Sequence, residues 1–233
     1  DKVITSISNI NEIRREAVRE LEKAITQTFM RKEIKLNMPS HALTKKLPKT
    51  VQVSLCLNNM SETLNYKKLN GADNIYIPLR FFINPKFKSQ IQVLMDKFNV
   101  FLLMPTISKG NYEKIDLQKV LKNNIKGVVI SNLSQIEYFN GMAKIGNYTL
   151  NISNNYTINE LQSLGITKYI TSPEFDKYTI QNLNNDIDKE VIVYGRTLIM
   201  TTEYCAIGTY KNCSGICENG RYKLKDRMGF EFP

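Results

Sequence analysis

Three of the four cysteines of the chain lie within thirteen residues, in the stretch CAIGTYKNCSGIC. Cys205, Cys213 and Cys217 have the spacing C-x7-C-x3-C, and nearby glycines let the backbone turn tightly around a centre. Thiolates at such spacing suit zinc or an iron–sulfur cluster, with Cys56 or a cysteine beyond Pro233 as the fourth ligand. The alternatives are three free thiols in a loop or a Cys213–Cys217 disulfide, and the local density of cysteines favours a metal.

Charged and polar side chains at expected strand ends form a second candidate site. Arg196 follows the apolar run EVIVYG, and Glu174 follows KYITSP. A planar guanidinium can hold a carboxylate or a phosphate through two hydrogen bonds. We assign Glu174 and Arg196 as candidate catalytic residues, and Arg80 and Asn151 as candidate substrate-binding residues. Alternatively, Glu174 pairs with Arg196 or stabilises a helix N-terminus, and Asn151 is a turn residue like most asparagines in this chain.

Signatures of the common hydrolases are missing from the sequence. The only histidine, His41, lies in an expected linker, which disfavours a Ser–His–Asp triad. The chain contains neither H-E-x-x-H nor G-x-S-x-G, which excludes a zincin and a nucleophile elbow. No pair of carboxylates suited to general acid–base catalysis is visible at the strand ends.

The chain has 233 residues and a net charge of +10, which favours anionic partners such as nucleic acid. However, lysine accompanies abundant asparagine and isoleucine throughout, and no dense run of basic residues occurs. Surface solubility is therefore the preferred explanation of the charge and a nucleic-acid face is the alternative, because patches rather than totals carry nucleic-acid binding.

The sequence predicts neither a membrane span nor a secretory signal. No apolar run reaches the roughly 18 residues of a transmembrane helix, and charges interrupt the apolar residues of the first thirty positions. We therefore expect a reducing, cytoplasmic compartment and no membrane partner.

The expected organisation is a helical extension with a linker over residues 1–50, followed by a barrel-like domain over 51–233. Residues 9–31 have apolar side chains at helical spacing, and Asn9 or Asn11 is the expected cap. From residue 51, seven short apolar runs alternate with helical segments: VQVSLC, NIYIPL, VFLLMP, GVVIS, YTLNI, KYITS and EVIVYG. This alternation predicts an α/β fold with a parallel sheet.

We favour a (β/α) barrel-like fold, specifically an incomplete TIM-type barrel, because the domain is shorter than the ~250 residues of a full barrel. The alternative is an open doubly wound sheet. The sequence has no G-x-G-x-x-G after the first expected strand, so the dinucleotide-binding form of that fold lacks support.

The C-terminal third resembles the collagenase-like peptidase family of unknown catalytic type, peptidase family U, number thirty-two. The matching residues are Gly195, Arg196, Met200, Glu203, Cys205, Cys213, Cys217, Leu224, Asp226, Arg227, Phe232 and Pro233. Looser cues are NEIRREAVRELE, GADNIYI, YTLNISN and TSPEF, so the resemblance extends over most of the chain.

The resemblance implies a barrel-like fold and a peptidase function. It also implies a second possibility, because similar members hydroxylate pyrimidines in tRNA or ribosomal RNA with an iron–sulfur cluster held by four cysteines. Cys205, Cys213 and Cys217 would then look like three of the four ligands. The chain departs from the family pattern at Leu198, where a cysteine is usual, and at Asn147, where an acid is usual.

Three functions follow from these observations. The chain is a module of a family-type peptidase, a module of an RNA-modifying hydroxylase, or a non-catalytic structural module. The missing start Met and the end at Pro233 suggest a fragment, so the expected partners are another module of the same longer chain and a peptide or RNA substrate.

Overall fold

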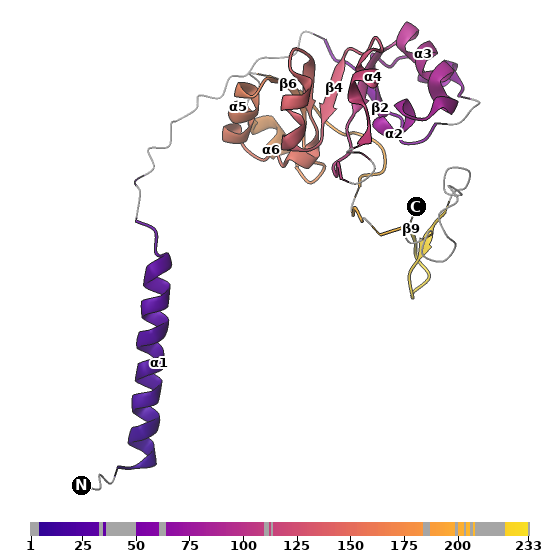
Figure 1. The fold of residues 1–233 in the computed structure, drawn as a ribbon. Helices are drawn as coiled ribbons and strands as arrows, with labels where there is room; N and C mark the ends of the chain where they lie inside the picture. The colour runs from indigo at the N-terminus through magenta and orange to yellow at the C-terminus, as the bar shows by residue number, and fades with distance from the viewer. Residues whose placement is uncertain are drawn as a thin grey trace. The chain divides into compact units, whose positions relative to one another are not determined.

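The computed structural model falls into two units, Asp1–Ala42 and Leu43–Pro233, which we describe separately (Figure 1). The structure describes the following residues: 5–32, 35, 50–60, 64–109, 112, 114–183, 187–198, 200–202, 204–205, 207 and 222–232.

The first unit contains one long helix, α1, which spans Ile7–Phe29. The helix begins two residues earlier than the sequence predicts, and neither Asn9 nor Asn11 is its cap. Instead, the Ser6 hydroxyl accepts a hydrogen bond of 3.2 Å from the backbone N–H of Asn9, which satisfies one donor of the first turn. No residue of α1 is buried.

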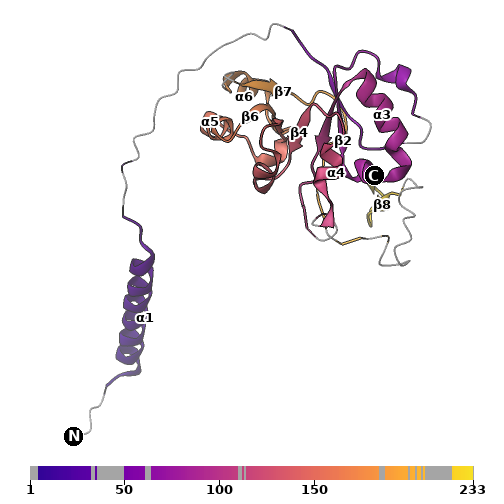
Figure 2. The ribbon, with the colours of Figure 1, turned by 45° about the horizontal axis from the view of Figure 1, so that its top comes forward.

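The second unit is built on a seven-stranded parallel sheet with the strand order β1-β2-β3-β4-β5-β6-β7. The strands are β1 Ser54–Cys56, β2 Asn74–Pro78, β3 Asn99–Leu103, β4 Gly127–Ile130, β5 Ala143–Gly146, β6 Ile166–Ile170 and β7 Asp188–Glu190. Each strand pairs with the next in sequence, and the sheet curls into a half-barrel (Figure 2). The prediction of an incomplete TIM-type barrel is therefore confirmed.

Helices connect the strands, as parallel pairing requires. The α-helices of this unit are α2 Leu79–Phe82, α3 Lys88–Lys97, α4 Leu117–Leu121, α5 Asn155–Ser163 and α6 Lys177–Asn182. Short 3-10 helices are η1 Tyr66–Leu69, η2 Pro85–Phe87, η4 Leu133–Gln135, η5 Glu137–Phe139 and η6 Tyr148–Leu150. A small antiparallel hairpin of β8 Leu224–Lys225 and β9 Glu231–Phe232 follows.

The fifth strand lies earlier than predicted. The run at 148–152 was expected to be a strand, but the strand is Ala143–Gly146 and residues 148–150 form η6. The reason is local, because the Asn147 side chain accepts a hydrogen bond from the N–H of Tyr148 and Asn151 adopts a left-handed conformation with φ 53°. Both residues end the extended backbone.

The motif TINE predicts a helix start with Thr157 as the cap, and SPEF predicts one with Ser172 as the cap; both predictions are wrong. The cap of α5 is Asn154, whose Oδ1 accepts from the N–H of Thr157 at 2.9 Å. The cap of α6 is Asp176, whose Oδ1 accepts from the N–H of Thr179 at 2.7 Å. In both cases a side chain with a free carbonyl or carboxylate oxygen precedes the first turn, which is the preferred capping chemistry.

Successive side chains of each strand point to opposite faces of the sheet, so the strands contribute to two apolar layers. Side chains such as Ile75, Val100 and Val128 point outward and pack with the helices in the main core. Their neighbours Tyr76 and Val129 point inward and form a smaller cluster inside the half-barrel. Burial of both faces is typical of parallel sheets, and it explains why the strand sequences are nearly continuous apolar runs.

Candidate functional site

A polar cluster around Glu190 lies at the two edges of the curled sheet. Glu190 Oε1, at the end of β7, accepts a hydrogen bond of 2.9 Å from Ser54 Oγ on β1 and one of 2.6 Å from the Tyr76 hydroxyl on β2. Lys168 Nζ on β6 lies 3.4 Å from the same oxygen. The side chains of Lys168 and Glu190 are only 17% and 19% exposed.

Two further contacts extend this cluster. Asn74 Nδ2 donates to Ser54 Oγ at 3.1 Å, and Lys168 Nζ donates to Gln52 Oε1 at 3.3 Å. Burial raises the pKa of Tyr76 far above its usual value, and the charge of Glu190 raises it further. The phenol therefore stays protonated and acts as a donor to the carboxylate.

The cluster joins β1 to β7 through side chains. Among the described residues, no backbone pairing links these two strands. A full barrel closes by pairing its last strand with its first; here the Ser54–Glu190 hydrogen bond makes the connection across the seam. Residue types alone did not point to this cluster, because the residues come from four separated strands.

An open cavity of about 3600 Å³ lies at the carboxyl ends of the strands and reaches the Glu190 cluster. Its charged lining residues within the described part of the chain are Arg80, Lys109, Lys168, Lys189, Arg196, Asp188 and Glu190. Basic side chains therefore outnumber acidic ones, and one of the two acids is already paired with Lys168. This lining favours a ligand with negative charge or with exposed oxygen acceptors.

Arg80 is held at the edge of the cavity by two contacts. It is the second residue of α2, directly after β2. Its Nη2 donates to the backbone carbonyl of Asn58, which follows β1. Its guanidinium also lies over the Phe81 ring, 4.8 Å from the centroid. These contacts orient the guanidinium, and no carboxylate pairs with it in the described part of the chain.

Cys56, the last residue of β1, also lines the cavity. The residue reaches the open cavity, yet neighbouring atoms remove enough hydration from the thiol to raise its pKa to about 11. The positive charge of Arg80 lowers the pKa, but desolvation is the larger effect. The thiol donates to Asn58 Oδ1 at 3.3 Å. A protonated thiol at neutral pH is a poor nucleophile.

Buried polar groups at the ends of β4 and β5 are satisfied by one another. Asn147 Nδ2 donates to Ser131 Oγ at 2.9 Å, and Thr149 Oγ1 donates to the Ser131 carbonyl at 2.8 Å. The Gln135 amide accepts from the Ser131 N–H and donates to the Pro105 carbonyl at 2.7 Å. These contacts fix the loops that form the cavity wall. The departure of Asn147 from the family pattern had already singled out this residue, and a polar residue directly after a buried strand is the signal for Ser131.

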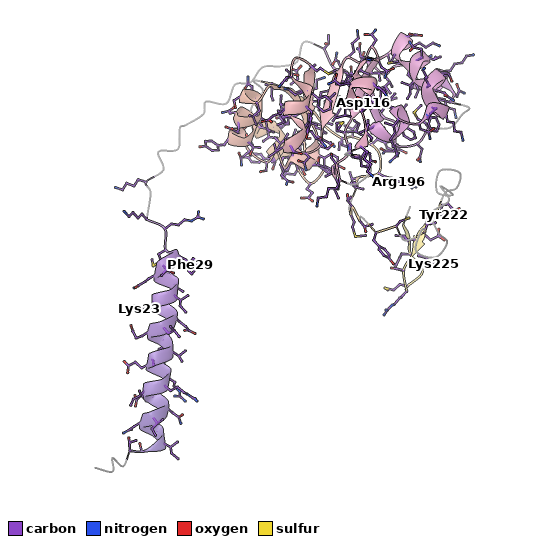
Figure 3. The ribbon with its side chains drawn as sticks, viewed as in Figure 1. Lys23, Phe29, Asp116, Arg196, Tyr222 and Lys225 are labelled. Atoms are coloured by element: carbon purple, nitrogen blue, oxygen red, sulfur yellow. The ribbon has the colours of Figure 1, made fainter. Side chains whose placement is uncertain are left out.

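The structure brings two of the four predicted site residues to the cavity. Arg80 and Arg196 both line it, and Arg196 is labelled in Figure 3. Glu174 and Asn151 are exposed but do not belong to the lining. No ion pair joins Glu174 to Arg196 within the described residues, and Asn151 is the left-handed residue that ends η6.

The structure does not test the predicted metal site. Cys205 is exposed, whereas Cys213 and Cys217 lie outside the described residues, as does His41. Among the residues that are described, no group of three His, Cys, Asp or Glu side chains could hold a metal. No helix in that part of the chain is both long and apolar enough to cross a membrane.

No protein-family model matches the chain, and neither a curated protein nor a solved structure matches it significantly. The family resemblance therefore rests on the motifs quoted above.

Proposed function

We propose that the chain is a module of a collagenase-like peptidase-family protein and that its half-barrel binds substrate at the carboxyl ends of the strands. The observation that carries the proposal is the open cavity with Arg80 and Arg196 in its wall. Proteolysis is the activity that the resemblance implies, and carboxyl strand ends are where barrel enzymes place their functional residues.

In this proposal the described residues bind and orient the substrate. Arg80 has one N–H engaged by the Asn58 carbonyl, and its other donors face a carboxylate, a phosphate or a main-chain carbonyl of the ligand. Arg196 supplies a second guanidinium on the opposite side of the sheet seam. The raised pKa of the Cys56 thiol makes it a poor nucleophile, so the proposal assigns no cleavage step to it.

A second function, a module of an iron–sulfur-dependent hydroxylase of tRNA or ribosomal RNA pyrimidines, is favoured by the basic lining of the cavity. Phosphate groups bind to arginine and lysine with a strong dependence on salt. The thiolates of Cys205, Cys213 and Cys217 would hold the iron–sulfur cluster. Of these three cysteines, Cys205 lies among the described residues. Zinc is the alternative metal for the same thiolates.

A third function, a non-catalytic structural module, is favoured by the mutual satisfaction of Ser131, Asn147 and Gln135. Groups that bond to one another hold a loop in place and leave few donors for a substrate. In this case the cavity would be a surface that another module covers.

One preparation distinguishes the three functions. The chain, purified without oxygen, is analysed for iron, sulfide and zinc beside a Cys213→Ser variant. It is then tested for gelatin cleavage and for binding of fluorescent RNA at several salt concentrations. Gelatin cleavage lost in Arg196→Lys supports the peptidase. Iron lost in Cys213→Ser, with salt-sensitive RNA binding, supports the hydroxylase. A folded, metal-free protein without either activity would contradict both.

A further inference from the structure

The helix α1 presents a wide apolar face that nothing in its own unit covers. At 3.6 residues per turn, its apolar residues fall within an arc of about 160°. The large members of this face are Ile7, Ile10, Ile13, Val18, Leu21, Ile25 and Phe29. Ile13 is 67% exposed and Leu21 is 59% exposed. Figure 3 shows Lys23 and Phe29 leaving the helix on different sides.

A helix of this kind needs a partner. An isolated helix is marginally stable in water, and in proteins most helical stability comes from packing of the apolar face. The 23 residues of α1 contain no buried residue and no acidic residue in the first turn. The partner must therefore cover an apolar strip that runs the length of the helix.

The charges of α1 argue against a membrane surface as this partner. The helix carries four acidic and four basic residues, so it is neutral, and the net charge of +10 lies elsewhere in the chain. Helices that lie on anionic membranes have polar faces rich in lysine and arginine. The polar face of α1 instead alternates both signs, which is typical of a helix that packs against protein.

We propose that α1 binds a second copy of itself in an antiparallel helix pair. In this arrangement Val18 lies opposite Leu21 of the second copy, and Ala17 lies opposite its Ala24. The same register puts Arg15 opposite Glu22 along one edge of the contact, and the two-fold symmetry repeats this attractive pair. The alanines allow the two backbones to approach closely.

The parallel arrangement is unfavourable for a specific reason. Arg14 is the one charged residue of α1 that lies within the apolar arc. A parallel pair would place Arg14 against Arg14 of the second copy, whereas the antiparallel pair places it beside Ile25 and near Glu22. The aliphatic part of Arg14 can then cover the apolar contact while its guanidinium approaches the carboxylate.

The test is the mass of the whole chain in solution, measured by light scattering across a concentration series. We expect a dimer that becomes a monomer in Leu21→Asp and stays a dimer in Thr26→Asp, which puts the same charge on the polar face. A chain that stays monomeric, or a dimer that Leu21→Asp leaves intact, would overturn the proposal.

Charge exchange tests the antiparallel register. Arg15→Glu and Glu22→Arg should each raise the dimer dissociation constant several-fold, and the double variant should restore it, with circular dichroism confirming equal helix content. If Leu21→Asp dissociates the dimer but the double variant Arg15→Glu with Glu22→Arg does not restore the dissociation constant, the antiparallel pair is contradicted. Monomeric chain that binds phosphatidylserine vesicles through Leu21 would show instead that a membrane surface covers this face.

Discussion

Ser54 and Glu190 are 136 positions apart in the sequence, yet Ser54 Oγ donates a hydrogen bond of 2.9 Å to Glu190 Oε1. This contact joins the first and last strands of the sheet. The same carboxylate oxygen accepts from Tyr76 and lies beside Lys168. Because all of these groups are largely buried, the cluster must be satisfied as a unit.

Glu190→Gln should therefore destabilise the second unit by about 1–3 kcal/mol, since it removes a charged acceptor from Lys168 and from two hydroxyl groups. Urea denaturation followed by circular dichroism measures this effect. Glu160→Gln, on the exposed side of α5, is the matched control and should change the free energy of unfolding by less than about 0.5 kcal/mol. Equal effects of the two substitutions would show that the cluster contributes no stability.

The Cys56 thiol should react slowly with iodoacetamide at neutral pH. In the folded protein its pKa is raised to about 11 from 9.0 by loss of hydration, so the thiolate fraction keeps growing between pH 9 and pH 11. Below pH 9 the thiol is protonated in both the folded and the unfolded chain. Between the two pKa values the unfolded chain loses this proton first. The group therefore lowers the free energy of unfolding as the pH rises.

Mass spectrometry of the Cys56 peptide after timed alkylation measures this shift. The labelling rate should be half-maximal near pH 11 in the native protein, whereas the same chain in urea should reach its half-maximal rate near pH 9. A native labelling rate that levels off at the same pH as in urea would exclude a raised pKa.

Arg80→Lys and Arg196→Lys should each weaken binding of a fluorescent RNA or an acidic peptide by roughly tenfold, because lysine keeps the charge but cannot form the bidentate hydrogen bonds of a guanidinium. Arg19→Lys on α1 makes the same exchange away from the cavity and should leave the affinity unchanged. Fluorescence anisotropy at fixed salt measures all three variants. Unchanged affinity in Arg80→Lys and Arg196→Lys would remove both residues from the proposed binding site.

Substitutions at Asn151 distinguish two roles of this residue, that of a turn residue and that of a ligand-binding residue. Its φ of 53° is left-handed, so Asn151→Gly should preserve or slightly raise the melting temperature, whereas Asn151→Val should cost about 1–2 kcal/mol of stability. Differential scanning fluorimetry compares the two variants. If Asn151→Gly keeps its stability but loses affinity for the probes above, Asn151 also contacts the ligand.

The sequence predicted the repeating units of the fold and the place of two cavity residues. Alternating apolar runs and helical segments are local patterns, and parallel crossovers leave the carboxyl ends of all strands at one edge of the sheet. For this reason Arg80 and Arg196 could be placed there from their positions after β2 and β7 alone. The exact boundaries were harder, since Asn147, Asn154 and Asp176 compete for the backbone through their own side chains.

What the sequence determined by itself is the class of the fold and the residue types that follow each strand. Only the tertiary structure decided which of those residues meet. Ser54, Tyr76, Lys168 and Glu190 lie on four strands, and no local pattern links them. They come together because the sheet curls until its first and last strands face each other, and the curl depends on the packing of the whole unit.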